Sequence, residues 1–397
     1  MINERAKEMA KVETIEALKV NLSPALTDET IEKARSLVGV WLRRDVHLPS
    51  LYEPISAHDI RRWTNYSVGD DNPLFCDPGY ARLTQWGVPI APPTFLYTID
   101  SGIVAPGLPG VQWIFAGGRW EHFEPVRQGD TITARARVID LQIKEGKSVP
   151  RFVNQVGEVI YTNQVGQTVS RYEGDIFRVP RSRSGQGFKF KEETGKRYKY
   201  SPEEISEIAA GYRNEARRGS VPRYWEDTNV GDALPVLFKG PLTLVDIVGF
   251  YAGRRTVYNV MKLAFAERDR HPSNCYVSPA TGVPMHPAAG HFDVEIAKEV
   301  GFPGAYDQGW QRLNWGGHLL TNWCGDHGFI RKYSGRVLVP NLVGDLTKLT
   351  GEVVDKTKED GEALVHIKWW GNNQRGEKNC DGLASIRLPS RDIAIKR

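Results

Sequence analysis

Side chains that change charge near neutral pH are the first candidates for chemistry, and this chain has nine histidines. His291 stands out because it follows the small residues P-A-A-G and precedes D-V-E-I-A-K-E-V-G, a segment with the pattern of a helix. A histidine held at such a point could act on water as a general acid or base. His286, five residues earlier, either completes a two-histidine pair or ends the preceding segment. Isolated histidines are more often structural or solvated, so we expect no catalytic role for His58, His122, His318, His327 and His366.

The composition excludes several other classes of function. The formal charge is +4 and the basic residues form no long run, so nucleic acid is not the leading partner. The N-terminus has no signal-like apolar run, and no stretch approaches the ~18 apolar residues of a membrane helix. We therefore expect a cytoplasmic protein that does not enter the membrane. The cysteines are scattered without a C-x-x-C pair, so we expect no metal site and no disulfide framework.

The length of 397 residues fits two domains. Residues 178–200 are rich in Ser, Gly, Pro and basic side chains, which is typical of a linker. Immediately afterwards, Ser201-Pro202-Glu203-Glu204 has the features of a helix start, with a hydroxyl cap, a proline and a glutamate that reaches back. The sequence thus predicts an N-terminal domain at 1–177, a linker at 178–200 and a C-terminal domain at 201–397. A helical segment from Thr27 precedes the first half in a comparable place.

An internal repeat supports this division. Asp77 opens a helical segment 53 residues before the Gly-Asp pair that ends at Asp130, and Asp293 opens another 52 residues before the pair that ends at Asp345. Alternating apolar strands follow each pair, at 152–161 and 363–370. An antiparallel sheet needs something against which to bury its apolar face. The repeat therefore predicts an α+β fold with two sheets, each wrapped around a central helix.

The first half carries a recognisable signature. Residues 69–78, G-D-D-N-P-L-F-C-D-P, resemble the G-D-x-N-P-L-H-x-D signature of the MaoC-like, or R-specific enoyl-CoA hydratase, family. The resemblance covers nearly the whole chain and implies a double hot-dog fold. Asp70 stands at the place of the family's catalytic aspartate, whereas Phe75 stands at that of its histidine. Asn72, together with Asp70, either positions water or caps the loop ahead of Pro73.

The first half departs from the family at a second point. Where the family has His-Gly opening the central helix, this chain has Pro92-Pro93. Proline has no N–H with which to polarise a thioester carbonyl. The resemblance therefore implies a non-catalytic, acyl-binding first half.

The second half resembles the catalytic half of such proteins. Its H-F-D segment aligns His291 with the family's catalytic histidine, and G-F-P-G-A-Y-D-Q-G-W places Gly309 at the oxyanion glycine. A helix N–H at that glycine would stabilise a developing enolate. This half also departs from the family, because His286 replaces the aspartate and Gln308 replaces the histidine before the glycine.

Further residues could contact substrate. Tyr306, Asp307 and Trp310 flank Gly309 and either line an acyl pocket or belong to the core. An insertion of about 29 residues, broadly 254–284, is absent from the first half and forms either a lid or a solvated flap. Its basic residues, among them Arg254 and Arg255, could meet a CoA phosphate or a substrate carboxylate.

The resemblance implies hydration of a 2-enoyl thioester or, in reverse, dehydration of a 3-hydroxyacyl thioester. His291, helped by His286, by a carboxylate of the insertion or by Asp70, would move the protons, and no cofactor is needed beyond the CoA or acyl carrier of the substrate. The resemblance also implies a homo-oligomer. Two alternatives remain, a hot-dog thioesterase and a non-catalytic acyl-CoA-binding subunit.

Overall fold

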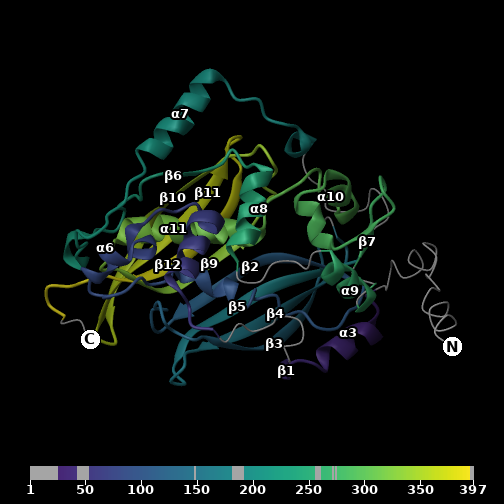
Figure 1. Ribbon diagram of the computed structural model, residues 1–397, viewed down its shortest axis with the longest axis horizontal. Coiled ribbons are helices and arrows are strands. Elements are labelled where there is room, and N and C mark those ends of the chain that lie inside the picture. Colours follow the sequence, from purple (N-terminus) through teal and green to yellow (C-terminus); the bar gives the residue numbers. More distant parts are fainter. Residues whose placement is uncertain are drawn as a thin grey trace.

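One antiparallel sheet runs through both halves of the chain (Figure 1). The computed structural model describes residues 26–42, 53–146, 149–180, 192–254, 261–270, 272 and 275–393. Within them the strands follow the order β1-β3-β4-β5-β2-β9-β12-β11-β10-β6. The first half supplies β1 (Trp41–Leu42), β2 (Gln112–His122), β3 (Thr133–Lys144), β4 (Phe152–Thr162) and β5 (Thr168–Val179). The second half supplies β6 (Leu237–Lys239), β9 (Phe329–Val337), β10 (Thr347–Glu359), β11 (Glu362–Asn373) and β12 (Lys378–Arg387).

The two halves meet where β2 pairs with β9. Buried Trp120 lies opposite buried Tyr333 in this pairing. A Cβ atom at Gly117 would lie 2.4 Å from the carbonyl oxygen of Gly335, so the strands can approach only with glycine there. Backbone hydrogen bonds therefore join the halves into one sheet, where the sequence predicted two.

The repeated Gly-Asp pairs build the same turn twice. Gly129 and Gly344 adopt φ values of 97° and 99°, which favour glycine. Asp130 and Asp345 each accept, through Oδ2, the backbone N–H of the residue three positions earlier, at 2.7 and 2.8 Å. The segments that begin at Asp77 and Asp293 also correspond, because each aspartate caps a short helix. The repeat seen in the sequence is thus a repeat of structure.

The central helices differ between the halves. Helix α11 (Gly309–Cys324) spans sixteen residues and is buried from Trp310 onwards. Its counterpart is a 3₁₀ helix, η2 (Pro93–Thr98), of six residues. The chain beyond it, G-I-V-A-P-G-L-P-G at 102–110, is rich in glycine and proline and cannot continue a helix. The expected pair of central helices is therefore complete only in the second half.

The predicted helix start after the linker is confirmed. Ser201 Oγ accepts the Glu204 N–H at 3.2 Å, and Glu204 Oε2 accepts the Ser201 N–H at 2.8 Å. Helix α7 (Pro202–Arg213) follows, while residues 181–191 of the predicted linker lie outside the described residues. In the described ranges no helix combines the length and apolar character that a bilayer span requires.

The remaining elements cover the sheet or form the insertion. The helices are α3 (Asp28–Arg35), α4 (Ala57–Arg62), η1 (Trp63–Val68), α5 (Pro73–Cys76), α6 (Pro78–Arg82), η3 (Glu192–Gly195), η4 (Trp225–Asp227), α8 (Leu244–Gly253), α9 (Lys262–Arg270), η6 (Pro287–His291) and α10 (Val294–Val300). The hairpin of β7 (Tyr276–Val277) and β8 (Pro284–Met285) belongs to the insertion. A hydrogen bond of 3.0 Å between the Tyr276 hydroxyl and Gln112 Oε1 ties this insertion to the start of β2.

Two adjacent glycines of α11 should respond oppositely to alanine. A Cβ atom at Gly316 would lie 2.5 Å from the Tyr333 hydroxyl and 2.8 Å from the Trp369 ring, whereas at Gly317 its nearest neighbour is Thr94 Cγ2 at 3.5 Å. We expect Gly316→Ala to destabilise the protein by about 1–3 kcal/mol through overpacking. Gly317→Ala should stabilise it by up to about 1 kcal/mol through helix propensity.

Urea unfolding followed by circular dichroism measures both variants. Equal effects of the two substitutions would show that the approach of α11 to the sheet does not depend on Gly316.

Candidate active site

The loop after η1 presents the signature aspartate. The π-helix η1 ends at Gly69, whose φ of 66° turns the chain, and the Asp70 N–H then donates to the Thr64 carbonyl at 3.0 Å. Asp70 Oδ1 accepts the Asn72 N–H at 2.9 Å, and Asn72 Oδ1 accepts the Leu74 N–H at 3.0 Å at the start of α5. π-Helical turns are often found at functional sites. This loop fixes the direction of both polar side chains.

A lysine from the second half holds the same loop. Lys239, at the end of β6, is buried and donates from Nζ to the carbonyls of Val68 and Gly69 at 2.9 and 3.0 Å. Burial lowers the pKa of Lys239 to about 8, although Asp70 and Glu215 act to raise it. The lysine therefore supplies positive charge beneath the aspartate.

An imidazole from the central helix of the second half meets Asp70. His318 Nε2 lies 3.2 Å from Asp70 Oδ1 and 3.0 Å from Glu215 Oε1. The side chains of Asp70 and His318 are 1% and 0% exposed. Asn322, one turn further along α11, donates from Nδ2 to Glu215 Oε1 at 2.8 Å. The two halves thus build one buried acid/base cluster, which we define as Asp70, Glu215, Lys239 and His318.

The cluster keeps its carboxylates ionised. Burial acts to raise the pKa of Asp70, but His318 and Lys239 outweigh it, and the pKa lies below its ordinary value. The pKa of Glu215 is also lowered, because His318, Lys239 and Asn322 outweigh its desolvation. Since two carboxylate oxygens face His318 Nε2, a hydrogen on that nitrogen is favoured. In the part of the chain that the structure describes, no group of side chains is suited to hold a metal ion.

An arginine lies on the outer side of the cluster. Arg217 Nη2 forms an ion pair with Asp71 and lies 3.9 Å from Asp70 Oδ1. Its side chain is partly exposed, whereas that of Asp70 is not. Arg217 thereby adds positive charge near the loop without entering the cluster.

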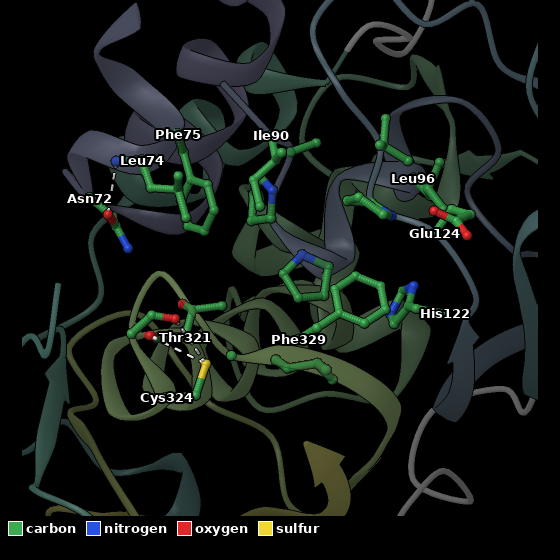
Figure 2. A pocket seen from close by; sticks show the side chains of 18 residues that line it. Asn72, Leu74, Phe75, Ile90, Leu96, His122, Glu124, Thr321, Cys324 and Phe329 are labelled. Carbon is green, nitrogen blue, oxygen red and sulfur yellow. Dashed lines mark hydrogen bonds between the residues drawn. The ribbon is translucent and has the colours of Figure 1, made fainter. Parts of the chain in front are cut away.

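A largely apolar cavity (Figure 2) is lined in part by residues that are hydrogen-bonded to members of the cluster. It encloses about 610 Å³, counting the space at its mouth, and lies between the signature loop, η2 and the C-terminal end of α11. Asn72 and Thr321 line one end, and the Asn72 amide nitrogen points toward the Thr321 side. Thr321 Oγ1 donates to the His318 carbonyl at 3.1 Å. Asp70 and His318 do not line the cavity themselves, but each is hydrogen-bonded to a residue that does, Asn72 and Thr321 respectively.

Known proteins resemble this chain in sequence and in fold. A family model described as FAS1-like, dehydratase domain region, matches residues 45–171. Over 87 residues the chain is 32% identical to an (R)-specific enoyl-CoA hydratase from Aeromonas caviae, a match that covers 22% of this chain and 63% of the hydratase. A UPF0336 protein from Thermobifida fusca is 26% identical over 134 residues, which are 31% of this chain and 87% of that protein.

Solved structures extend the similarity to the whole chain. A MaoC-like dehydratase aligns with a TM-score of 0.59 at 16% identity, covering 90% of this chain and 99% of its own. The chain is thus similar in fold to a MaoC-like dehydratase, and over residues 45–171 it is similar in sequence to a FAS1-like dehydratase region. A double-hotdog protein from Mycobacterium tuberculosis aligns with a TM-score of 0.51 at 10% identity, over 88% of this chain and 96% of its own. The expected α+β double hot-dog fold is thus confirmed.

The structure brings one of the residues singled out by sequence to the cavity and a second one close behind it. Asn72 lines the cavity, and Asp70 accepts the Asn72 N–H without lining the cavity itself. Phe75, at the family's histidine position, also lines the cavity and cannot exchange a proton. The imidazole beside Asp70 comes instead from His318, to which the sequence assigned no role.

The histidines predicted to be catalytic lie at the other end of α11. His291 Nδ1 lies 3.0 Å from the Tyr306 carbonyl oxygen, and burial lowers the pKa of His291 to about 4. His286 Nδ1 accepts the Ala288 N–H at 3.1 Å and so caps η6. A Cβ atom at Gly309 would lie 2.6 Å from the Phe115 ring, so an aromatic side chain packs against the proposed oxyanion position.

The other predicted substrate contacts also surround this end of α11. The Tyr306 ring packs against His291 and Phe302. Asp307 is buried and its carboxylate oxygens lie 2.8 and 3.1 Å from the Arg312 guanidinium. The Arg254 guanidinium lies 5.3 Å from the centroid of the buried Trp310 ring, while Arg255 lies outside the described residues. The substrate-binding roles of these residues stay predictions.

A signal for the missed residues was present in the sequence. Helix α11 is buried, yet it carries polar residues at Gln311, Arg312, Asn314, His318, Thr321 and Asn322. Buried polar side chains are costly unless they are paired, so such a helix indicates a polar site along its length. Glu215 offered no comparable signal, because it follows α7 in an irregular segment.

The cluster makes a prediction about acid stability. Because the folded-state pKa of Asp70 lies below its unfolded value near 3.8, its ionisation stabilises the folded state above that pH, and this contribution is lost as the pH falls through the folded value. Asp70→Asn removes the titration. The difference in unfolding free energy between wild type and Asp70→Asn should therefore shrink below about pH 4.

Urea midpoints at pH 7, 5 and 3.5 measure this difference. Glu215→Gln should behave in the same direction, since the pKa of Glu215 is also lowered. A difference that stays constant down to pH 3 would contradict the ionised state of Asp70.

Proposed function

We propose that this protein hydrates 2-enoyl thioesters, and in reverse dehydrates 3-hydroxyacyl thioesters, with Asp70 and His318 as its acid/base pair. The observation that carries the proposal is the 3.2 Å contact between the signature aspartate and an imidazole of the other half, beside an apolar cavity. Perturbed titratable groups next to a cavity are typical of catalytic sites.

The two members of the pair suit opposite tasks. Asp70 is ionised and can take a proton from water. In the proposed step His318 acts as an imidazolium whose Nε2–H lies between Asp70 and Glu215, so that it can give a proton and be left neutral. Glu215 would keep the imidazole oriented, much as a carboxylate orients the histidine of other acid/base groups.

Asn72 offers the electrophilic contact that Pro93 cannot provide. Its Oδ1 is occupied by the Leu74 N–H, which fixes the amide and directs Nδ2 into the cavity (Figure 2). An amide N–H can stabilise the negative charge that develops on a thioester oxygen. Asn72 would thus replace the backbone donor that the family places at the helix start.

The reaction then balances with proton transfers alone. Water loses a proton to Asp70 while its oxygen bonds to C3, and the thioester enolate forms against Asn72. His318 then donates a proton to C2. The proton that Asp70 took from water passes to His318, so that both groups return to their starting states. Dehydration is the reverse sequence, and neither direction requires a redox or metal cofactor.

The cavity suits the acyl part of such a substrate. Its wall is largely aliphatic and aromatic, which favours an alkyl or ring-bearing chain. CoA is favoured as the carrier because a relative is named as an enoyl-CoA hydratase, while an acyl-carrier protein remains an alternative. Assembly into a homo-oligomer and residence in the cytoplasm stay predictions.

Replacing His318 tests the assignment directly. We expect His318→Ala and Asp70→Asn each to lower kcat by roughly 10²–10⁴, because each removes one member of an acid/base pair. The double variant should lose little more than either single one, since the two residues act as a unit. Hydration is followed as loss of the enoyl-thioester absorbance.

His291→Ala is the matched control, because it removes another histidine from the same half. If His291→Ala abolishes turnover while His318→Ala preserves it, catalysis belongs to the second-half site that the sequence favoured. Release of free thiol without hydration would identify a thioesterase, and binding without either change would identify an acyl-binding subunit. Unfolding curves for each variant exclude loss of the fold as the cause.

A further inference from the structure

The cavity has a second polar end, at His122. This residue closes β2, is 6% exposed, and lines the cavity on the side opposite Asn72 (Figure 2). Its Nε2 atom is buried and has no hydrogen-bond partner among the described residues. A buried nitrogen without a partner is costly, so one that faces a cavity points to a ligand group.

The tautomer of His122 follows from its neighbour. The Ser170 hydroxyl has one hydrogen, which it donates to the Glu121 carbonyl at 2.9 Å. Ser170 Oγ also lies 3.1 Å from His122 Nδ1, so Nδ1 must carry the hydrogen and donate it. In a neutral imidazole the other nitrogen is then a pure acceptor. Nε2 is therefore a lone-pair acceptor without a protein partner, on a side chain that lines the cavity.

The surroundings keep the ring neutral and fixed. Burial lowers the pKa of His122 to about 3, and the charge of Arg331 acts in the same direction. Arg331 Nη1 donates to the His122 carbonyl at 3.2 Å, which holds that positive charge near the residue. The imidazole stacks on the Trp120 ring with centroids 5.4 Å apart and planes 11° from parallel. The acceptor cannot easily turn away or become a donor.

The rest of this end of the cavity offers no competing donor side chain. Glu124 is a second acceptor, and apolar side chains such as Leu96, Val126 and Phe329 complete the wall. A ketone, ether or carboxylate group of a ligand at this end would place its own lone pairs against the acceptor atoms of His122 and Glu124, which is unfavourable. A neutral hydroxyl group satisfies them.

We propose that the cavity selects acyl groups that carry a hydroxyl away from the thioester, donating to His122 Nε2. This rests on the proposed function, in which the thioester lies at the Asn72 end. Under this proposal the protein recognises the acyl chain through a hydrogen bond at its far end as well as through apolar contacts. A site with a buried acceptor discriminates against ligands that lack the donor.

The experiment compares enoyl-CoA substrates of one chain length with a hydroxyl at successive positions beyond C4, and the matched methyl and keto compounds. For wild type we expect one hydroxyl position to raise kcat/KM by roughly 10- to 100-fold over the methyl compound. His122→Phe keeps an aromatic ring against Trp120 but has no acceptor, so the preference should disappear while the methyl compound is still hydrated.

Ser170→Ala gives an independent test that preserves the imidazole. Without the Ser170 oxygen, the Nδ1 hydrogen loses its partner, and the tautomer with hydrogen on Nε2 becomes accessible. The preference for hydroxyl over keto compounds should fall in this variant. If His122→Phe does not fold, Ser170→Ala alone decides the point.

Failure of this inference is distinguishable from failure of the proposed function. Hydration of plain enoyl-CoA with no hydroxyl preference at any position would overturn the inference alone, and it would indicate that Nε2 binds only water. If no enoyl-CoA is hydrated, calorimetry with saturated hydroxyacyl-CoA and its methyl analogue still tests the cavity. Tighter binding of the hydroxyl compound that is lost in His122→Phe supports the inference, and equal binding overturns it.

Discussion

The burial of Asp70 against a lysine and a histidine, beside the partly exposed Glu215, is the constraint on which the site at the junction of the halves depends. Asp70 arrives from the first half, whereas Lys239 and His318 come from β6 and α11 of the second. A carboxylate this deeply buried would be protonated or displaced without its cationic partners. Removing one partner from such a group commonly costs about 3–5 kcal/mol. The cluster therefore couples the position of the signature loop to the correct docking of both halves.

This coupling matters for the proposed acid/base site because the chain lacks two groups found in the family that it resembles, the histidine of the signature loop and the glycine N–H at the helix start. The loop of the first half has Phe75 in place of a histidine, and η2 has no glycine N–H to offer. In the proposed function both missing groups are replaced, by an imidazole from α11 and by the side-chain amide of Asn72. The continuous sheet makes this exchange possible, because pairing of β2 with β9 fixes the halves relative to each other. Chemistry distributed over two halves requires such a rigid connection.

The sequence predicted those features that are local. The Gly-Asp turns, the Ser201 cap and the strand alternation each depend on a few neighbouring residues, and each was found. The proximity of Asp70 to His318 depends on residues 248 positions apart, and no local pattern carries that information. His291 attracted attention through its motif position, yet its pKa is set by burial and by neighbours that only the fold brings together. The six-residue η2 was missed for a related reason, since the motif predicts a helix there but the glycines and prolines beyond it end the helix early.

Polar groups at the two ends of an otherwise apolar cavity can fix the orientation of a bound acyl chain. Its walls would accept an acyl chain at any depth, because apolar burial has no preferred direction. Asn72 presents donor hydrogens at one end, and His122 presents a lone pair at the other. A substrate that places an acceptor at the first and a donor at the second can bind in one register and one orientation only. In the proposed function the same two contacts would hold C2 and C3 close to Asp70 and His318. The contacts that select the acyl group would therefore also align it for proton transfer.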